Sequence, residues 1–465
     1  MKNANTKSRA SSVSKLRARL LTSWAAVSVL AASLLFIGLL TGCQQNGSSS
    51  GGGNTSSKPA NSAIFKTDGK GTIIGCTCEK NKLPPNLVIP DKIGDEVIKK
   101  IGWRAFADCE GLKSIDFSAC TKLNEIKVGA FDGCTGLKQL ILPESLTTIG
   151  MEAFRHCPIE TLCINSDIES YYPPGDKTAW LNEDSIRENL KTLKLGRGIT
   201  TILYPAFKGC TGLTSVDFSN CKKLTQIDGF PNCTGLTSIT LPENLTHIGY
   251  RAFQGCTGLT SITLPENLIE IGYRAFEGCI GLTSITLPEK LTKIDDRAFK
   301  DCTGLNGTIV FPANIETIYG DINYSDSGAF RNCINLQGLD FSACKNLTFM
   351  PAYAFYGCKA LSEVKLPENI DVIGINTFED CIALQNITLP ANLTSIKANA
   401  FKGCTNLTSV VFKNTQNWKV YNNYNCTSLH KYINQGYLQD AADAAKFLRE
   451  DDNNGGYSNK HWKRN

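Results

Sequence analysis

The feature that most constrains this chain is a unit that recurs twelve times and ends in Ala-Phe-x-x-Cys or a close variant. Cys233, Cys256, Cys279 and Cys302 end four successive units and are each 23 residues apart. A fixed period of this length predicts a solenoid, because one short unit cannot bury its apolar face alone and must stack on its neighbours. A solenoid offers an extended surface, so the repeat favours function through that surface over a single closed pocket.

Each unit contains the spacing of a short strand, for example Leu259, Ile262 and Leu264, which Pro265 ends because proline has no N–H to donate. This spacing resembles the L-x-x-L-x-L core of leucine-rich repeats. We therefore expect a leucine-rich-repeat solenoid of α/β-type units, with one sheet of parallel strands on the concave face. Short helical or irregular turns are expected on the convex face, with Phe276 of this unit filling the core.

The proline after the strand and the Ala-Phe-x-x-Cys ending together resemble the BspA-like leucine-rich repeat proteins of host-associated bacteria. The resemblance covers residues 63–465, and the eight other units end at Cys109, Cys134, Cys157, Cys210, Cys333, Cys358, Cys381 and Cys404. It implies a cell-surface protein that adheres to host or bacterial partners. It also implies an N-terminal capping unit at 63–101, a solenoid at 102–412 and a C-terminal cap with an amphipathic helix at 413–465.

The N-terminal segment has the pattern of a leader. Residues 1–42 hold six basic residues and no acidic residue, and 20–40 are largely apolar, which is typical of a secretory signal peptide. The ending Leu40-Thr41-Gly42-Cys43 resembles a bacterial lipobox, which implies that Cys43 is lipidated and begins the mature chain, and that the protein is anchored at the outer membrane. An uncleaved membrane-spanning anchor is the alternative. Residues 43–62 are rich in Gly and Ser and predict a flexible tether.

Charge and motifs exclude several function classes. Without residues 1–42 the chain has 42 basic and 43 acidic residues, so we expect no nucleic-acid partner. The sequence has no GxSxG, HExxH or P-loop motif, and its four histidines lie far apart. We therefore expect no enzyme activity, no cofactor and no metal site.

Twenty cysteines in an exported chain usually indicate disulfides. Here the period favours a stack of reduced thiols in the core, because equivalent cysteines of parallel turns point the same way and cannot face each other. Cys163 differs, since alternation with Leu162 and Ile164 places it on the outer face of its strand. We expect Cys163 to be the most exposed thiol.

Two sets of residues form the candidate ligand surface. The first is a column of hydroxyl groups along the concave sheet, at Thr237, Thr240, Thr260, Thr263, Thr283 and Thr286. The second comprises tyrosines in two insertions of the repeat, at Tyr171, Tyr172, Tyr319 and Tyr324. Threonine also suits any exposed strand, and insertions also arise by drift, so both structural explanations stay open. Rows of Glu and Arg beside the strands are expected to be solvated edges.

The predicted function is that of an adhesin. A lipid anchor and a tether would present the solenoid at the cell surface, where it binds an extracellular host or bacterial protein or a glycan. The alternative is a structural envelope protein, or a protein of contacts between bacterial cells, that has no host ligand. The sequence does not separate the two.

Overall fold

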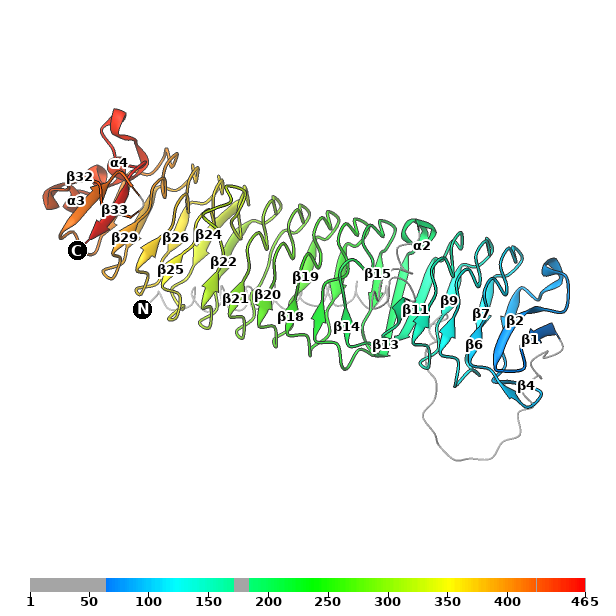
Figure 1. Cartoon of the computed structure of the whole chain (residues 1–465). Coiled ribbons are helices and arrows are strands. Elements are labelled where there is room, and N and C mark those ends of the chain that lie inside the picture. Colours follow the sequence, from blue (N-terminus) through cyan, green and yellow to red (C-terminus); the bar gives the residue numbers. More distant parts are fainter. Residues whose placement is uncertain (1–63, 171–183, 424, 465) are drawn as a thin grey trace, which may run out of the picture. The chain divides into compact units, whose positions relative to one another are not determined.

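The structure is a computed structural model that describes residues 64–170, 184–423 and 425–464. These residues form a parallel-strand solenoid of about 13 turns, as predicted (Figure 1). The predicted leader 1–42, the tether 43–62 with Cys43, and the loop residues Tyr171 and Tyr172 lie outside the described residues.

One wall of each turn is the strand that the leucine pattern predicts, and we call this wall the long-strand ladder. Neighbouring strands pair in parallel and in register, for example with Ile239 opposite Ile262. The turn at 283–286 keeps the same path, since the Thr283 N–H donates to the Thr260 carbonyl at 3.3 Å. The strands are β3 (Asn86–Val88), β7 (Ser114–Asp116), β9 (Gln139–Ile141), β11 (Thr161–Ser166), β13 (Thr192–Gly198), β15 (Ser215–Asp217), β17 (Ser238–Thr240), β19 (Ser261–Thr263), β22 (Gly307–Val310), β24 (Leu336–Asp340), β26 (Glu363–Lys365), β28 (Asn386–Leu389) and β30 (Ser409–Phe412).

A second wall carries its own parallel strands, which we call the short-strand ladder, so the expectation of a single sheet is wrong. Equivalent segments of stacked turns lie side by side, and any extended segment can therefore pair its N–H and C=O groups with the next turn. Most of these strands have only two residues, too few to show a period of two in the sequence. They are β2 (Thr72–Cys76), β6 (Lys100–Ile101), β8 (Glu125–Ile126), β10 (Thr148–Ile149), β12 (Glu169–Ser170), β14 (Thr201–Ile202), β16 (Gln226–Ile227), β18 (His247–Ile248), β20 (Glu270–Ile271), β21 (Lys293–Ile294), β23 (Thr317–Ile318), β25 (Phe349–Met350), β27 (Val372–Ile373) and β29 (Ser395–Ile396).

The third wall holds the Ala-Phe-x-x-Cys segments, which form tight turns without a helix. Within one unit the Cys279 N–H donates to the Phe276 carbonyl at 3.0 Å. Between units the Phe253 N–H donates to the Ala275 carbonyl at 2.7 Å, and the Phe276 N–H donates to the Ala298 carbonyl at 2.7 Å. Because these N–H groups bond to the next turn, they are not available for the i to i−4 bonds of an α-helix.

Phenylalanine and cysteine fill the core behind this third wall. The ring centroid of Phe276 lies 5.5 Å from that of Phe253 and 5.2 Å from that of Phe299, and both ring pairs are stacked. The thiol of Cys279 donates to the carbonyl of Phe253, in the preceding unit, at 3.1 Å. The cysteines that end the units are buried and form no disulfide, as predicted. Burial raises the pKa of the Cys256 thiol to about 12.

Two positions of each unit have a left-handed backbone, which the sequence reasoning missed. The residue before each unit-ending Cys has a positive φ in all twelve units, from 59° at Asp301 to 76° at Gly403. A side chain with a Cβ disfavours this conformation by about 1–2 kcal/mol, and Gly, Asn and Asp tolerate it best. This explains why eleven of the twelve units have Gly, Asn or Asp there, with His156 as the exception. The residue before Ala-Phe is also left-handed in many units, as at Arg274 with φ 57°.

The prediction that Cys163 is exposed is wrong, because its accessible surface is only 2% of the maximum. Its strand β11 lies between β9 and β13, and its register partners are Ile141 and Lys194. The alternation of side chains along a strand predicts which face a side chain points to. It does not predict how long the side chains beside it on the adjacent strands are. A short thiol between two longer side chains is shielded from both sides.

Additional elements lie at the two ends and in one insertion. Before the first full turn, β1 (Phe65–Thr67) pairs antiparallel with β2, and η3 (Lys80–Lys82), β4 (Lys92–Ile93) and β5 (Glu96–Val97) follow. The helix α2 (Asp184–Asn189) lies in the first insertion. After the last turn come β31 (Trp418–Tyr421), β32 (Leu429–Tyr432), α3 (Gln435–Gln439), α4 (Ala441–Arg449), η5 (Asp452–Asn454) and β33 (His461–Arg464). Strand β33 pairs antiparallel with β29 and β31, so the C-terminal segment continues the short-strand ladder in the opposite direction.

Replacing Cys279 by Ala tests the contribution of one core thiol. The change removes the donor to the Phe253 carbonyl and leaves a small cavity, so we expect the free energy of unfolding to fall by about 1–3 kcal/mol. Urea unfolding followed by circular dichroism measures this change. The exposed Thr263, replaced by Ala, is the control and should shift stability by less than about 0.5 kcal/mol. Equal unfolding midpoints for Cys279→Ala and the unmodified protein would show that the thiol contributes nothing.

From His461 in β33 we predict that the stability of the C-terminal end of the solenoid depends on pH. Burial, and then the charge of Lys397, lower the pKa of His461, and its Nδ1 accepts a hydrogen bond from the Ala398 N–H at 3.3 Å. The unfolded chain therefore binds a proton near pH 6.5 while the folded chain resists it. Neutral His461 therefore contributes to the free energy of unfolding in full above pH 6.5. This contribution decreases as the pH falls below that value, with a slope of at most about 1.4 kcal/mol per pH unit.

Hydrogen exchange of the β33 amides at pH 7.5 and pH 5.5 measures this effect. We expect His461→Gln, which keeps an acceptor and cannot titrate, to show a smaller loss of protection at pH 5.5 than the unmodified protein. The same loss in both proteins would rule out His461 as the cause.

Candidate functional site

The six predicted threonines lie on one surface, on the outward side of the long-strand ladder. We call this surface the hydroxyl face. Pairing of β17 with β19 places Ser238 beside Ser261 and Thr240 beside Thr263, while Ile239 is directed into the core. All residues of the hydroxyl face are exposed: Thr237, Ser238, Thr240, Thr260, Ser261, Thr263, Thr283, Ser284 and Thr286.

The hydroxyl groups on this face differ in their hydrogen bonds. The Thr260 hydroxyl donates to the Thr237 carbonyl at 3.1 Å, and the Thr283 hydroxyl donates to the Thr260 carbonyl at 3.3 Å. These bonds link neighbouring turns. Among the described residues, the hydroxyls of Thr240, Thr263 and Thr286 make no such bond and keep their donors and acceptors for solvent or a ligand.

The hydroxyl face is also uncharged. From Thr237 to Val310, four successive turns carry no charged side chain at the three outward positions of the strand. The nearest charges along the same column are Asp217 on β15 and Asp340 on β24. A row of exposed carboxylates, at Glu243, Glu266 and Glu289, follows the proline that ends each strand and borders the face.

The second described insertion, residues 319–328, presents the other candidate aromatic residues. Tyr319 is 45% exposed and Tyr324 is 61% exposed, and the Lys293 ammonium lies 5.1 Å from the centroid of the Tyr319 ring. Tyr319 directly follows β23 of the short-strand ladder. The structure therefore places Tyr319 and Tyr324 on a different wall from the hydroxyl face, so these two tyrosines and the six threonines do not form one site.

This insertion is held to the repeat by polar contacts. Asp296 accepts hydrogen bonds from the Ser327 hydroxyl at 2.6 Å and from the Gly328 N–H at 2.8 Å. Asp326 forms an ion pair with the ammonium of Lys300 at 2.8 Å. The loop that carries Tyr324 is thus attached at its C-terminal end to one turn of the solenoid, the unit that ends at Cys302.

The predicted basic row at Arg251, Arg274 and Arg297 is no solvated edge, because its side chains are half-buried or buried. Arg251 lies 4.9 Å above the centroid of the Tyr250 ring, and Arg274 lies 5.1 Å above that of Tyr273. Arg251 also lies 5.9 Å from the centroid of the Tyr204 ring, and Arg297 lies 5.9 Å from that of Tyr273 in the preceding turn. Their role is to join turns, which matches their position in the left-handed corner of each unit.

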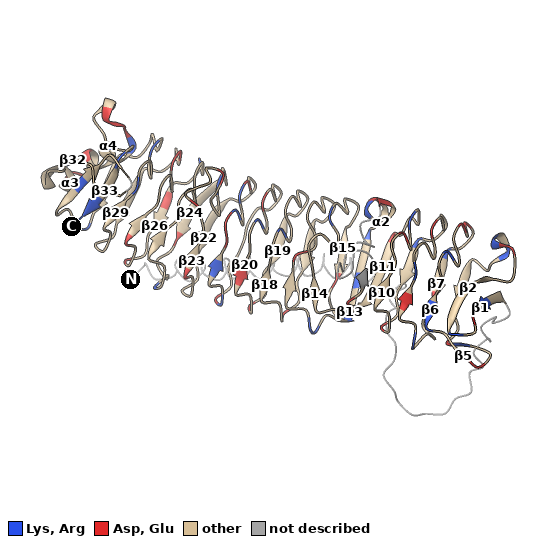
Figure 2. Cartoon of the chain, viewed as in Figure 1, with Lys and Arg blue, Asp and Glu red and all other residues tan. Residues whose placement is uncertain are grey.

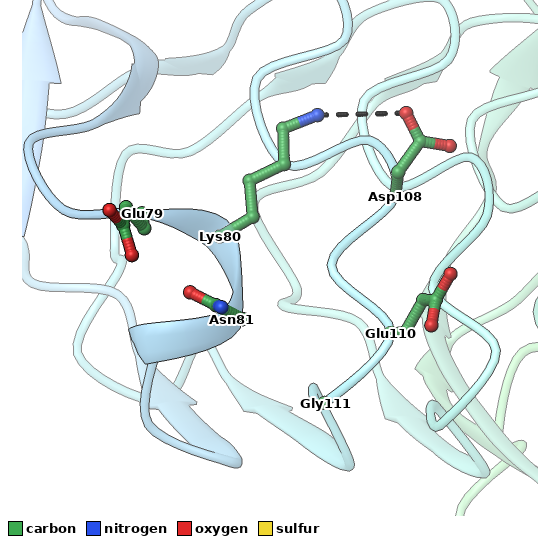
Figure 3. A pocket seen from close by; sticks show the side chains of 6 residues that line it. All are labelled: Glu79, Lys80, Asn81, Asp108, Glu110 and Gly111. Atoms are coloured by element: carbon green, nitrogen blue, oxygen red, sulfur yellow. Dashed lines mark ion pairs between the residues drawn. The ribbon is translucent and has the colours of Figure 1, made fainter.

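A shallow groove of about 370 Å³ lies near the N-terminal end (Figure 3). Its lining is polar: Glu79, Lys80, Asn81, Asp108, Glu110 and Gly111. Lys80 forms an ion pair with Asp108 at 3.6 Å, which joins η3 to the first Ala-Phe-x-x-Cys turn. The groove is open, and its Asp108 carboxylate is paired with both Lys80 and Arg104.

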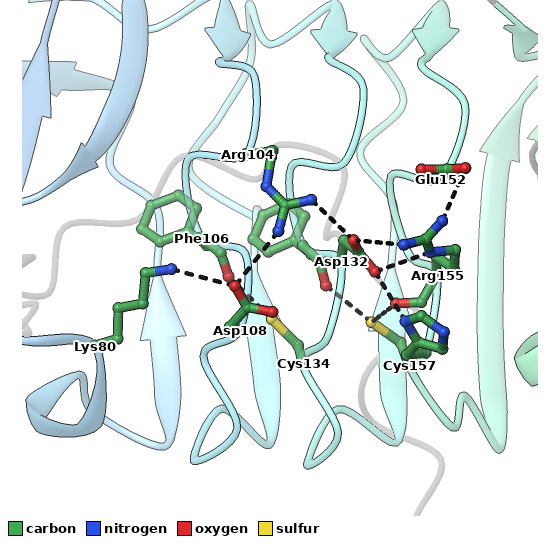
Figure 4. A network of polar contacts seen from close by, with 11 residues as sticks. Lys80, Arg104, Phe106, Asp108, Asp132, Cys134, Glu152, Arg155 and Cys157 are labelled. Carbon is green, nitrogen blue, oxygen red and sulfur yellow. Dashed lines mark hydrogen bonds and ion pairs between the residues drawn. The ribbon is translucent and has the colours of Figure 1, made fainter.

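The same network continues along the third wall (Figure 4). Asp132 is buried and contacts Arg104 at 3.0 Å, Arg155 at 3.3 Å and His156 at 3.1 Å. Burial alone would raise the pKa of Asp132, but the hydrogen bond from His156 and the charge of Arg155 outweigh it, and the pKa is lowered. Three donors saturate this carboxylate, which therefore stabilises three neighbouring turns.

Two features are absent from the described ranges. No cluster of three or more His, Cys, Asp or Glu side chains with the geometry of a metal site occurs in residues 64–170, 184–423 and 425–464. Within the same ranges, no helix has both the length and the apolar character needed to span a bilayer.

The family model for the BspA-type leucine-rich repeat region, with six copies, matches residues 86–174, 185–306, 226–327 and 323–439. The chain belongs to the BspA-type leucine-rich repeat family. Proteins of this family are bacterial cell-surface proteins, and leucine-rich-repeat solenoids generally bind other proteins. No curated protein matches the BspA-type chain.

Solved structures with a similar fold include three bacterial proteins. A leucine-rich repeat protein from Bacteroides ovatus is 25% identical, with 75% of this chain and 85% of that chain covered and a TM-score of 0.47. A leucine-rich cell surface protein from Faecalibacterium prausnitzii is 20% identical, with coverage of 80% and 96% and a TM-score of 0.30. The pneumococcal vaccine antigen PcpA is 17% identical, with coverage of 74% and 78% and a TM-score of 0.29.

Proposed function

We propose that this BspA-type protein is a surface-exposed lipoprotein that acts as an adhesin. It binds an extracellular protein of a host or of a neighbouring bacterial cell, or a glycan on either, through the hydroxyl face. The observation that carries the proposal is the run of four uncharged turns with exposed hydroxyls from Thr237 to Val310. Leucine-rich-repeat solenoids typically serve as binding scaffolds, which supports a binding role over catalysis.

The chemistry of the hydroxyl face suits a large polar partner. Each hydroxyl group can donate one hydrogen bond and accept others, and no side chain on this face needs a counter-ion. Backbone pairing between β17 and β19 fixes the spacing of the hydroxyls before binding. A partner therefore orders few groups of this surface when it binds, which lowers the entropic cost. The exposed tyrosines Tyr319 and Tyr324, with Tyr171 and Tyr172 in the other insertion, supply a second contact on the same partner.

The lipoprotein part of the proposal concerns residues outside the described ranges. In it, residues 1–42 are removed, Cys43 is acylated, and residues 43–62 link the lipid anchor to the solenoid. Two or more acyl chains are needed for stable attachment, since a single chain binds a membrane only marginally. Residues 63–101 and 413–465 then act as the two capping units, and the membrane is the outer membrane of the bacterium.

Adding charge to the hydroxyl face tests the adhesin proposal. We expect the triple variant Thr240→Lys, Thr263→Lys and Thr286→Lys to fold as the parent and to bind at least ten-fold more weakly. The reason is that three ammonium groups would have to be desolvated at the centre of the contact. Binding of the purified mature protein to immobilised extracellular-matrix proteins and to whole bacterial cells is the measurement.

The matched control adds the same charge to the same three turns on another wall, as Thr234→Lys, Thr257→Lys and Ile280→Lys. These positions directly follow the unit-ending cysteines and are exposed. If both triple variants bind every partner as the parent does, the hydroxyl face is not the binding surface. Binding to bacterial cells alone, with no matrix protein bound, would favour the structural and cell–cell contact role.

A further inference from the structure

A row of cationic side chains with an aromatic end lies on the last strands of the short-strand ladder. The register of β29, β33, β31 and β32 aligns Ser395, Lys463, Lys419 and Tyr432 in one line across four strands. The adjacent line of Ile396, Trp462 and Val420 is buried in the core. In the first line Lys463 and Tyr432 are exposed and Lys419 is half-buried, whereas Ser395 is buried. Lys463, Lys419 and Tyr432 therefore form the outward side of this sheet, and we call these three residues the C-terminal cationic row.

Lys419 and Lys463 form a cross-strand pair of like charge. Such pairs destabilise a sheet, whereas opposite charges in the same position stabilise it. Elsewhere in this ladder the paired lysines face carboxylates: Glu270 is the register partner of Lys293, and their charged groups are 2.8 Å apart. Within the described residues, neither Lys419 nor Lys463 forms an ion pair.

In the long-strand ladder, too, neighbouring lysines are paired with a carboxylate, unlike Lys419 and Lys463. Glu160 lies between Lys138 and Lys191 of the adjacent strands, at 2.8 Å from each. The hydrogen bonds from these two lysines lower the pKa of Glu160 to about 2. A carboxylate thus lies between Lys138 and Lys191 and pairs with both of them. Within the described residues, no carboxylate pairs with the two lysines of the C-terminal cationic row.

Most acidic residues of the C-terminal segment have partners elsewhere. Residues 413–465 contain eight basic and five acidic residues, and all five acidic residues lie between 440 and 452. Asp440 accepts hydrogen bonds from two N–H groups at the start of α4, Glu450 pairs with Arg449, and Asp452 pairs with Lys460. Figure 2 shows basic residues on β33 at this end of the solenoid.

Tyr432 gives the row a second kind of contact. It is 64% exposed and lies on β32, whose four residues are all exposed and which forms the outer edge of its sheet. The Lys419 ammonium lies 5.2 Å from the centroid of the Tyr432 ring. A ligand that follows the row would meet two ammonium groups and then an aromatic ring over about 10 Å, from two spacings of neighbouring strands.

From this arrangement we infer that the C-terminal cationic row binds a linear acidic polysaccharide. Carboxylate or sulfate groups of the polymer neutralise Lys419 and Lys463, and the C–H face of one sugar ring packs on Tyr432. The row is open at both ends, which suits a polymer better than a small anion that needs an enclosed site. A membrane surface fits less well, because the three residues of the row include no large aliphatic side chain to enter the acyl layer, and the exposed Phe349 of the same line lies three strands away from Lys463.

This site is separate from the hydroxyl face, so its test does not depend on the proposed adhesin function. The purified mature chain is titrated with two polyanions, heparin and polygalacturonate, in low salt. We expect both to bind, and we expect the double variant Lys419→Gln, Lys463→Gln to lose at least ten-fold in affinity. The slope of the logarithm of the binding constant against the logarithm of the salt concentration should be smaller by about two in the double variant than in the parent, roughly one for each lysine removed.

Two controls separate recognition from general charge. The variant Lys222→Gln, Lys223→Gln removes the same charge from exposed positions in the middle of the solenoid and should bind as the parent does. Tyr432→Ala should weaken binding and leave the salt dependence unchanged. Removing the like-charge pair should leave the thermal midpoint unchanged or raise it, so lost affinity cannot be attributed to unfolding.

Three outcomes would overturn the inference. The first is that the parent protein binds neither polysaccharide at low salt. The second is that the Lys222, Lys223 control loses as much affinity as the Lys419, Lys463 variant. The third is that phosphatidylglycerol vesicles or double-stranded DNA bind as tightly, with the same dependence on Lys419 and Lys463.

Discussion

The carbonyl of the core phenylalanine holds each turn of this solenoid to the next. The Phe253 carbonyl accepts the Cys256 N–H of its own turn at 3.1 Å and the Cys279 thiol of the following turn at 3.1 Å. A carbonyl has two lone pairs, and one donor from each of two turns uses both. Cysteine suits this position because its thiol is a weak donor on a small, apolar side chain that tolerates complete burial. Ten of the twelve unit-ending cysteines, all but Cys109 and Cys210, donate the thiol to the carbonyl of the core phenylalanine of the preceding unit, so the repeat of Phe-x-x-Cys reflects one hydrogen-bond arrangement used in most turns.

This arrangement leaves the other walls free to vary. The third wall is fixed by the thiols, by the stacked phenylalanine rings and by left-handed corners, and it joins neighbouring units closely. The long-strand ladder is held by backbone pairing, so outward side chains such as Thr240 and Thr263 carry no packing role. For this reason the hydroxyl face can stay uncharged over four turns, and residues 319–328 can be inserted after β23 without disturbing the stack. The proposed binding surfaces lie where the fold imposes the fewest constraints.

The sequence predicts the parts of this structure that depend on the period. Stacking of parallel turns follows from the 23-residue spacing, and the buried thiols follow from the direction shared by equivalent side chains. Exposure of Thr240, Thr263 and Thr286 follows from alternation along each strand. The short-strand ladder could not be predicted, because two residues such as Glu270 and Ile271 show no periodicity. Cys163 could not be placed either, because its shielding depends on Ile141 and Lys194, which are distant in sequence.

Other features left a signal that the sequence reasoning did not use. The restriction of the position before Cys to Gly, Asn and Asp in nearly every unit indicates a positive φ. The clustering of all acidic residues of the C-terminal segment in 440–452 leaves Lys419 and Lys463 without nearby carboxylates in the sequence. Their cross-strand pairing, however, depends on the antiparallel return of β33, which brings residues 44 positions apart into register. Such pairing is a property of the tertiary fold.

The most direct test of the thiol-to-carbonyl account is a cysteine map of the native protein by alkylation and mass spectrometry at pH 8. The account predicts that Cys256, Cys358 and Cys404, whose pKa values burial raises to about 12, remain unmodified thiols in the folded protein and react only after unfolding. The half-buried Cys76, Cys78 and Cys426 should react first. Disulfides among Cys233, Cys256, Cys279 and Cys302, or alkylation of these residues as fast as of Cys76, would contradict it.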